Sequence, residues 1–279
     1  MKKIGFYQRL TLLFLGAFLL FSLPFYSLFP SAQTASISQD ISQDYSQDFS
    51  VRLSCFSTWF SQNDGGRCRN IALAAQWIDG VTVQPYGEFS FNKRVGKRTK
   101  SAGFHEAKII LQGEFVQGVG GGVCQVSTTL YNAALLAGMT VEEFHPHSLP
   151  VSYVPPSRDA MVSSASDLTF VNPYPFPVRI KATAKNEEVT VRFYGKKKTS
   201  DYKISSVITG ELPPPEPIEK EAGEGVKERE GRKGFTSEAY LERYEKGLLV
   251  SRKKLRTDSY APQRGVVVKK NADTTKKMP

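Results

Sequence analysis

Apolar and polar positions follow a helical period in residues 71–79. The apolar residues of this run recur at the i, i+3, i+4 and i+7 positions of one helix face. Asn70 is suited to cap the helix at its start, and Gly80 is suited to end it. We therefore expect a helix here whose apolar face packs in the core.

The strongest helical pattern, residues 123–137, follows a glycine-rich stretch that ends at Gly122. At 100° per residue, one face carries Val126, Leu130, Ala133 and Ala137. The opposite side carries Cys124, Thr128, Tyr131 and Leu135. We therefore expect Cys124 to point away from the main apolar face, toward a cleft.

Several other segments show the pattern of short strands. Residues 81–92 indicate two strands around Pro85 and Gly87, and 107–119 indicate a strand pair that turns at Gly113. Residues 141–195 indicate a series of strands with a hairpin tip at 186–188. Helical and strand signals alternate without a regular βαβ repeat. The predicted fold class is therefore α+β, a single compact domain in which the glycine-rich loop and its helix pack on antiparallel strands.

Changes of composition divide the chain into parts. A membrane anchor or signal peptide is expected at 1–35, a low-complexity Ser-Gln-Asp spacer at 36–51, and the main domain at 52–196. A charged, Pro- and Gly-rich linker is expected at 197–235. Residues 236–279 are expected to form a small β-rich appendage, with two strands turning at Lys246 and Gly247, and a frayed tail.

The N-terminal segment indicates export. Lys2, Lys3 and Arg9 precede residues 10–29, a run without charge. A span needs about 20 apolar residues, and the sequence around Ala32 is a poor signal-peptidase site, so we favour an uncleaved anchor. The positive-inside rule then places the rest of the chain outside the cytoplasm. The expected location is the bacterial cell membrane, or the cell wall if the signal is cleaved.

The charge of the chain argues against one class of partner. The 37 Lys and Arg residues exceed the 27 Asp and Glu residues, which gives a net charge of +10. This excess is spread along the chain and forms no basic stripe that could neutralise a phosphate backbone. We therefore expect no nucleic-acid partner, and an anionic cell envelope suits the surface better.

The chain has three cysteines, an odd number for a protein outside the cytoplasm. Cys55 and Cys68 flank a turn signal at 63–66, which predicts a disulfide between them. Cys124 is then a free thiol. Its alternatives are a chemical role and a buried, inert side chain.

The surroundings of Cys124 favour a nucleophile. A helix N-terminus stabilises a thiolate, and bare backbone N–H groups at Gly121 and Gly122 are candidates for an oxyanion hole. His145 and His147 follow 21 and 23 positions later as candidate bases. We prefer His147, because it is expected to lead a strand.

Asp159 is the candidate third member that orients the histidine. A nucleotide-binding loop is disfavoured, because no Lys-Ser or Lys-Thr follows the glycines. No cofactor is expected under this interpretation. The alternative is zinc held by Cys124, His145 and His147, which would remove the sulfur as a nucleophile.

The sequence resembles the VanW family over about residues 52–195. The blocks that carry the resemblance are GVGGGVCQVSTTLYNAALLAG, HPHSLPVSYVP, RDAMV and DLTFVNPYPFPVRI, with FSTWF, RNIALAAQWIDG, GEFSFNKRVGKRT and GFHEAKII upstream. Ser157, Met161 and Phe104 depart from the residues that are usual at their positions, and none of these changes removes a candidate catalytic group. The family takes its name from a glycopeptide-resistance gene cluster, and this does not establish vancomycin resistance here.

The resemblance implies a VanW-like catalytic domain in which Cys124 is the nucleophile of an L,D-transpeptidase. Such an enzyme makes 3-3 cross-links between peptidoglycan stem peptides. Arg98 and Arg158 are candidates for binding stem carboxylates, because a guanidinium matches that geometry. Thr128 and Tyr131 complete the expected substrate-binding set. The alternatives are a non-catalytic envelope-binding module and a thiol peptidoglycan hydrolase or carboxypeptidase.

Overall fold

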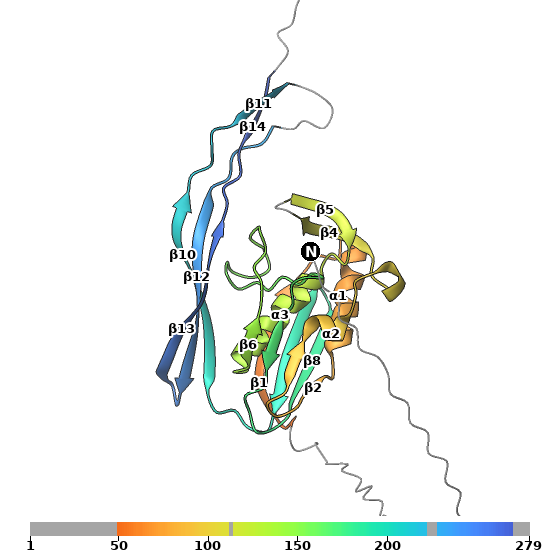
Figure 1. The fold of residues 1–279 in the computed structure, drawn as a ribbon, viewed down its shortest axis with the longest axis vertical. Helices are drawn as coiled ribbons and strands as arrows, with labels where there is room; N and C mark the ends of the chain where they lie inside the picture. Colours follow the sequence, from red (N-terminus) through yellow and green to blue (C-terminus); the bar gives the residue numbers. More distant parts are fainter. Residues whose placement is uncertain (1–48, 112–113, 222–227, 270–279) are drawn as a thin grey trace, which may run out of the picture. The chain divides into compact units, whose positions relative to one another are not determined.

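The computed structural model describes residues 49–111, 114–221 and 228–269 (Figure 1). The anchor or signal peptide expected at 1–35, and nearly all of the spacer expected at 36–51, lie outside these residues. Within the described part of the chain, no helix is both long and apolar enough to cross a bilayer. Strands predominate over helices, which is compatible with the α+β class.

The core is built on a four-stranded antiparallel sheet with the order β1-β9-β8-β2. Its strands are β1 (Val51–Trp59), β9 (Glu188–Gly195), β8 (Val178–Lys185) and β2 (Thr82–Val83). The hairpin predicted at 186–188 joins β8 to β9, and Asn186 and Glu187 take φ angles of 52° and 62° in its turn. Since β1 pairs with β9, the first and last strands of this domain lie side by side.

The predicted helix after the glycines is confirmed as α3 (Val123–Leu136), and both of its sides are buried. Val126 and Leu130 are buried as expected, and so are Thr128 and Tyr131 on the other side. The reason is the position of α3, which packs against β1, β9 and α1 and also against β6 and β10. Only the first turn, with Cys124, reaches a cleft.

The first predicted helix is confirmed as α1 (Gly65–Ile78) and begins earlier than expected. Its N-cap is Asp64, whose side chain accepts the N–H of Arg67 at 3.0 Å. Asn70, the expected cap, lies inside the helix. Its side chain instead donates to the carbonyls of His105 and Gly121, both at 2.9 Å, and so ties α1 to the glycine-rich turn.

Two small sheets surround this core. One has the order β3-β7-β6, formed by β3 (Glu88–Ser90), β7 (Thr169–Val171) and β6 (Thr140–Glu143). The other is the predicted hairpin of β4 (Glu106–Leu111) and β5 (Glu114–Val119). Two short helices, α2 (Phe91–Val95) and η2 (Lys100–Ala102), connect β3 to β4. Phe170 stacks on Phe89 at 4.8 Å and meets Phe193 edge-on at 5.8 Å, which joins the first small sheet to the central sheet.

The segment from 144 to 168 is irregular, so the expectation that His147 leads a strand is wrong. Its ladder pairing is a single bridge between His145 and Met161. The prolines at 146, 150, 155 and 156 explain this, because proline cannot donate a ladder hydrogen bond.

The C-terminal part is larger than the predicted appendage. A three-stranded sheet has the order β10-β12-β13, with β10 (Asp201–Leu212), β12 (Gly234–Glu245) and β13 (Leu248–Tyr260). The predicted turn is confirmed at Lys246 and Gly247, which have φ angles of 50° and 82°. Beyond this sheet, β11 (Ile218–Glu221) pairs in parallel with β14 (Val266–Lys269).

The prediction of a linker at 197–235 is wrong over 201–212. The alternating apolar positions of this stretch form β10, which pairs with β12 along its whole length. The Pro- and Glu-rich residues that follow dominate the composition of the range and concealed this strand.

Candidate active site

Cys124 is the second residue of α3, directly after a turn that only glycine can make. Gly120 and Gly122 have φ angles of 91° and 104°. A Cβ at Gly121 would lie 2.5 Å from the carbonyl oxygen of Lys108. The glycines therefore let the turn pass close to β4, and this places the sulfur at the positive end of the helix dipole.

The thiol of Cys124 has two polar neighbours. Its Sγ lies 3.4 Å from the carbonyl oxygen of Val162. Its other partner is the side chain of His147. Burial raises the pKa of the Cys124 thiol, but the hydrogen bond and charge of His147 outweigh that effect and bring the pKa below its ordinary value. The arrangement therefore favours a thiolate.

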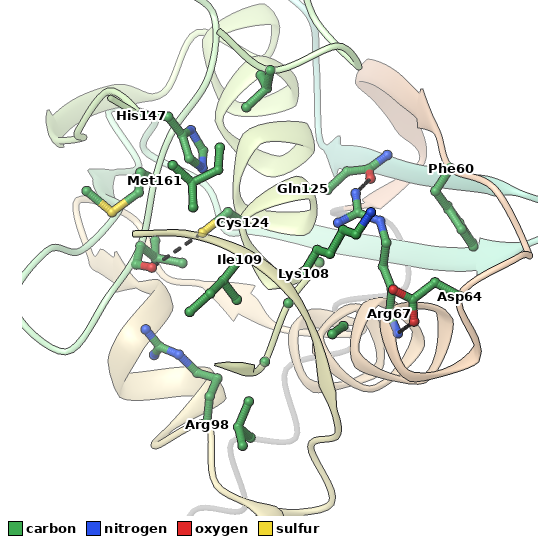
Figure 2. A pocket seen from close by; sticks show the side chains of 18 of the residues that line it. Phe60, Asp64, Arg67, Arg98, Lys108, Ile109, Cys124, Gln125, His147 and Met161 are labelled. Carbon is green, nitrogen blue, oxygen red and sulfur yellow. Dashed lines mark hydrogen bonds between the residues drawn. The ribbon is translucent and has the colours of Figure 1, made fainter. Parts of the chain in front are cut away.

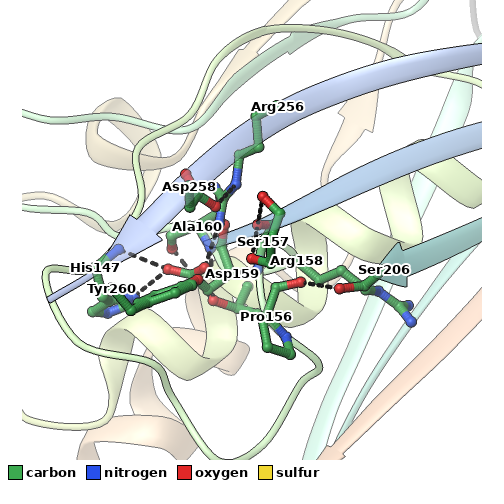
Figure 3. Close-up of polar contacts among 12 residues, drawn as sticks. His147, Pro156, Ser157, Arg158, Asp159, Ala160, Ser206, Arg256, Asp258 and Tyr260 are labelled. Carbon is green, nitrogen blue, oxygen red and sulfur yellow. Dashed lines mark hydrogen bonds and ion pairs between the residues drawn. The ribbon is translucent and has the colours of Figure 1, made fainter. Parts of the chain in front are cut away.

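His147 is held from its other side by Asp159 (Figure 3). The two residues make an ion pair with Nδ1 and Oδ2 2.6 Å apart, and the same oxygen accepts the backbone N–H of His147 at 2.7 Å. Because Nδ1 is engaged by the carboxylate, Nε2 is the nitrogen left for the sulfur. Burial opposes the imidazolium, but the hydrogen bonds to Asp159 and Cys124 raise the pKa of His147 to about 9.

Asp159 is buried and held as a carboxylate by two groups. Burial raises its pKa, but the hydrogen bond from His147 and the charge of Arg256 bring the pKa below its ordinary value. Arg256 donates to Oδ1 of Asp159, and also to its backbone carbonyl at 2.8 Å. The order of the buried chain is therefore Cys124, His147, Asp159, Arg256.

Sequence reasoning missed Arg256. It lies on β13, outside the residues that resemble a known family, and 97 positions after Asp159. Nothing in the local pattern of β13 separates it from the other basic residues of that strand. Only the packing of the C-terminal sheet reveals its contact with the site.

An open cavity of about 1450 Å³ lies beside Cys124 and His147 (Figure 2). Aromatic side chains on its walls include Trp59, Phe60, Phe115 and Tyr153. The positive side chains on its walls are Arg67, Lys97, Arg98 and Lys108. Its acidic side chains are Asp64, which caps α1, and Glu106, which pairs with Lys100 at 2.8 Å. The cavity therefore presents an excess of positive charge near the thiol.

Arg98 lies in this cavity, as its expected role requires. Its Nη1 donates to Oδ1 of Asn92 at 2.7 Å and to the carbonyl of Gly96 at 3.1 Å. Burial lowers the pKa of Arg98, and the charges of Cys124 and Asp167 oppose that shift. The guanidinium is thus fixed in position, and its charge lowers the pKa of the Cys124 thiol.

Arg67 is a cavity residue that sequence reasoning missed. Its Nη2 donates to Oε1 of Gln125 at 2.5 Å. The amide of Gln125 in turn donates to Oγ1 of Thr58 at 3.0 Å and to the carbonyl of Trp59 at 2.9 Å. Gln125, the residue after the nucleophile candidate, therefore holds Arg67 at the cavity wall.

Other expected site residues do not reach the cavity. Arg158 points away from Asp159 in Figure 3; its Nε donates to Asn132 at 3.0 Å, and its guanidinium lies 5.2 Å from the ring centre of Phe56. Thr128 is buried and accepts the N–H of Ala160 at 3.0 Å. Tyr131 is buried and stacks on Phe144 at 5.1 Å. The structure thus gives these three residues packing contacts.

His145 is also directed elsewhere, since its Nε2 lies 2.8 Å from Oε1 of Glu143. The zinc alternative required His145 together with Cys124 and His147. Among the described residues, no group of three or more His, Cys, Asp or Glu side chains is placed to hold a metal ion. The structure therefore brings together Cys124, His147 and Asp159 without His145.

Gly121 and Gly122 both line the cavity, where an oxyanion hole was expected. Two N–H groups of the same turn are already engaged. Val123 donates to the carbonyl of Gly120 at 3.1 Å, and Gln125 donates to that of Gly122 at 2.9 Å. The assignment of Gly121 and Gly122 as oxyanion donors stays a prediction.

The predicted disulfide between Cys55 and Cys68 is not formed, and all three cysteines are free. Cys55 is exposed on β1, whose neighbours Ser54 and Thr58 bond to α3 on the inner side of the sheet. Cys68 lies in α1, where its Sγ is 3.5 Å from the carbonyl of Ser61. Since α1 packs against β8 and α3 in the core, the outward direction of Cys55 keeps the two sulfurs apart.

Comparisons with known proteins place this site within a shared region. Residues 66–194 match a family model described as VanW like protein. The uncharacterized protein YoaR of Bacillus subtilis (strain 168) is 42% identical over 144 residues, which are 51% of this chain and 48% of that protein. The chain thus spans about half the length of this curated relative.

A solved structure, titled crystal structure of HP0197-G5, is matched over 25% of this chain and 97% of that chain, with 18% sequence identity. Its TM-score of 0.16 is too low to support an argument about the fold.

Proposed function

We propose that the chain, whose residues 66–194 match the VanW family model, is a cysteine acyltransferase acting on peptidoglycan stem peptides. The observation that carries the proposal is the arrangement of Cys124, His147 and Asp159. A thiol beside an imidazole that is oriented by a carboxylate is the arrangement used for acyl transfer. Peptidoglycan as the substrate rests on the family resemblance.

In the first step, the Cys124 thiolate attacks the carbonyl carbon of the third residue of a donor stem. A C–S bond forms, and the C–N bond to the terminal D-alanine breaks. The imidazolium of His147 gives its proton to the departing amine, so D-alanine leaves neutral at nitrogen. The backbone N–H groups at Gly121 and Gly122 are the proposed donors to the oxyanion of the tetrahedral intermediate.

In the second step, an amine of a neighbouring stem attacks the thioester. Neutral His147 takes the proton from this amine, a new amide bond forms, and the Cys124 thiolate leaves. The product is a 3-3 cross-link, and the thiolate and imidazolium are restored. No oxidant, metal ion or nucleotide enters this balance.

The charge of the cavity supports a substrate that carries carboxylates. Arg98 is fixed in the cavity that Cys124 also lines, and Arg67 is held at the wall by Gln125. The acidic residues of the cavity are engaged, Asp64 in capping α1 and Glu106 in its pair with Lys100. Stem peptides end in a carboxylate, so guanidinium groups near Cys124 suit them.

The proposed location is the outer face of the bacterial membrane, with the N-terminal segment as the anchor. It rests on the uncharged run at 10–29 and the basic residues before it. Substrate stems and acceptor amines both belong to that compartment. The mildly positive chain is suited to an anionic envelope.

Incubation of the full chain with a purified disaccharide tetrapeptide tests the proposal. Mass spectrometry should show a dimer that has lost one D-alanine, and Cys124→Ser should not produce it. The variant Cys55→Ser/Cys68→Ser is the matched control and should keep the activity. Release of D-alanine without a dimer would identify a hydrolase, in which water replaces the amine. Peptidoglycan binding without any product in a folded parent protein would instead identify a binding module.

A further inference from the structure

The C-terminal sheet contacts the segment that leads into Asp159 with each of its three strands. Oγ of Ser206 on β10 donates to the carbonyl of Pro156 at 2.5 Å. Ser237 on β12 and Ser157 have their hydroxyl oxygens 2.6 Å apart. The hydroxyl of Tyr260 on β13 accepts the N–H of Ser157 at 3.0 Å. Residues outside the VanW match therefore hold the turn that presents Asp159.

Arg256 makes the contact nearest to the chemistry, because it binds Asp159 twice (Figure 3). Its Nη2 donates to Oδ1, and its Nη1 donates to the backbone carbonyl of the same residue at 2.8 Å. Oδ2 remains for the ring and backbone of His147. Because the guanidinium binds both the main chain and the carboxylate of Asp159, it fixes the direction in which the carboxylate points.

A local irregularity of β13 accompanies this contact. Ala239 of β12 pairs with Arg256, and the next pair joins Tyr240 to Lys254, so Leu255 is an extra residue of a bulge. Bulges redirect neighbouring side chains and often lie beside functional sites. Arg256 emerges next to this bulge and enters the core domain.

The charged side chains that link Arg256 to His147 are buried. The exposed side-chain fractions of Arg256, Asp159 and His147 are 8%, 3% and 7%. Asp258 pairs with Nε of Arg256 at 2.7 Å and is equally buried. Buried ion pairs are costly to desolvate and add little net stability, so stability alone does not account for this arrangement.

We propose that the C-terminal sheet completes the active site, with Arg256 as the positioning residue that keeps Asp159 turned toward His147. This inference rests on the acyl transfer proposed above and extends it to residues outside the VanW match. Without Arg256, Oδ1 would be a buried and unpaired oxygen. The carboxyl group then takes up a proton or turns away, and in both cases His147 loses its partner.

The expected consequence appears at the sulfur. A less stable imidazolium raises the pKa of the Cys124 thiol and lowers the thiolate fraction at neutral pH. The other groups that face this chain are Asp258, Tyr131 and Tyr260 around Arg256, and Arg98 and Tyr153 around Cys124. Of these groups, Asp258 is the one that pairs with Arg256, so its carboxylate also loses a partner when Arg256 is replaced.

The test measures the rate of Cys124 alkylation by iodoacetamide between pH 5 and 10, on the full chain carrying Cys55→Ser and Cys68→Ser. Arg256→Met should move the alkylation profile to higher pH by roughly one unit in the pKa of the thiol, which is about a tenfold loss of rate on the rising limb of the profile. The alkylation rate of Arg256→Lys should lie between those of the parent and Arg256→Met, because an ammonium keeps the positive charge but cannot bind both Oδ1 and the backbone carbonyl of Asp159 as the guanidinium does. A profile of Arg256→Met that coincides with the parent, or moves to lower pH, overturns the proposal.

The matched control is Arg252→Met on the same strand. Arg252 is half-exposed, with its Nε 3.4 Å from Glu242, and it has no contact with Asp159. In the Arg252→Met protein, Cys124 should be alkylated at the parental rate. If Arg256→Met shows no cooperative unfolding, Arg256→Lys carries the test with an expected loss of about threefold, and parental rates in Arg256→Lys then overturn the proposal.

Cross-linking of stem peptides, measured on the same variants, separates the two proposals. The alkylation assay needs no stem peptide. If the parent makes no product but Arg256→Met still slows alkylation, the acyl transfer fails and the positioning role stands. If the parent makes product and Arg256→Met matches it in both assays, the positioning role fails and the acyl transfer stands.

Discussion

Oδ2 of Asp159 binds two groups of His147. It lies 2.6 Å from Nδ1 of the ring, and it accepts a hydrogen bond from the backbone N–H at 2.7 Å. One buried oxygen thus fixes the ring and the main chain of the residue that neighbours Cys124. This matters because the segment around His147 is irregular and lacks the ladder of a strand. The carboxylate replaces that ladder as the support of the imidazole.

Cys124→Ser is expected to abolish cross-linking while leaving the fold intact. Serine has nearly the same shape, but its hydroxyl is a far weaker nucleophile near neutral pH. The free energy of unfolding should change by less than about 1 kcal/mol, as for a substitution that makes no cavity. Mass analysis of the products and a thermal melt check both statements. Full activity in a folded Cys124→Ser protein would rule out the enzymatic interpretation.

The two histidines should behave differently. His147→Ala is expected to lower turnover by roughly 100- to 10,000-fold, the usual contribution of a positioned base. His145→Ala should be mild, because His145 pairs with Glu143 outside the cavity. Steady-state kinetics of both variants provide the comparison. Equal losses would show that the base has been assigned to the wrong histidine.

The pH dependence of cross-linking should report the protonation of His147. Its pKa is raised from 6.5 to about 9, so the ring keeps its proton across the neutral range. Cross-linking should fall as the pH rises through about 9, because His147 then loses the proton that it donates to the departing amine. The stabilisation that this ring adds should be full below pH 6.5 and lost through the same upper range.

Asp159→Asn provides the matched variant for that profile, because an amide cannot hold the imidazolium by charge. The descending limb should move to lower pH in Asp159→Asn. A limb that remains near pH 9 would show that Asp159 is not the group that raises the pKa of His147.

Tyr131→Phe should leave both activity and fold unchanged. Within the described residues, the hydroxyl of Tyr131 is buried without a hydrogen-bond partner. Its removal relieves an unsatisfied polar group, so stability should stay equal or rise by about 1 kcal/mol. Chemical denaturation measures this directly. A large loss of cross-linking with stability intact would restore the substrate-binding role expected from the sequence.

Thiol labelling of the denatured, non-reduced full chain should find Cys55, Cys68 and Cys124 all reactive. The structure keeps Cys55 on the outer side of β1 and Cys68 in α1. Peptide mapping after labelling identifies each site. Protection of Cys55 and Cys68 together would show that the bridge predicted from their spacing forms after all.

Local features of the sequence determined much of the core domain. The periodicity of 71–79 and 123–137 predicted α1 and α3, and the turn residues at 113, 186–188 and 246–247 predicted the hairpins. These elements follow from contacts between residues close in the chain. The glycine-rich turn before Cys124 has the same origin, because the positive φ angles at Gly120 and Gly122 are a local requirement.

Tertiary packing decided the rest. Both faces of α3 are buried because the C-terminal sheet and the irregular segment cover the side that the helical wheel left open, so Thr128 and Tyr131 became core residues. The same packing directed Cys55 outward and His145 toward Glu143. Periodicity describes which side chains share a face, but it does not say what covers that face.

The sequence alone determined that Cys124 lies at a helix start, with His147, His145 and Asp159 as its candidate partners. Only the tertiary structure showed that Asp159 is held by Arg256, 97 residues further along the chain. Residues so distant in sequence meet because β13 pairs with β12 in a sheet whose three strands all contact the turn before Asp159. That contact depends on the packing of the C-terminal sheet against residues 156–159, which leaves no trace in the pattern around either residue.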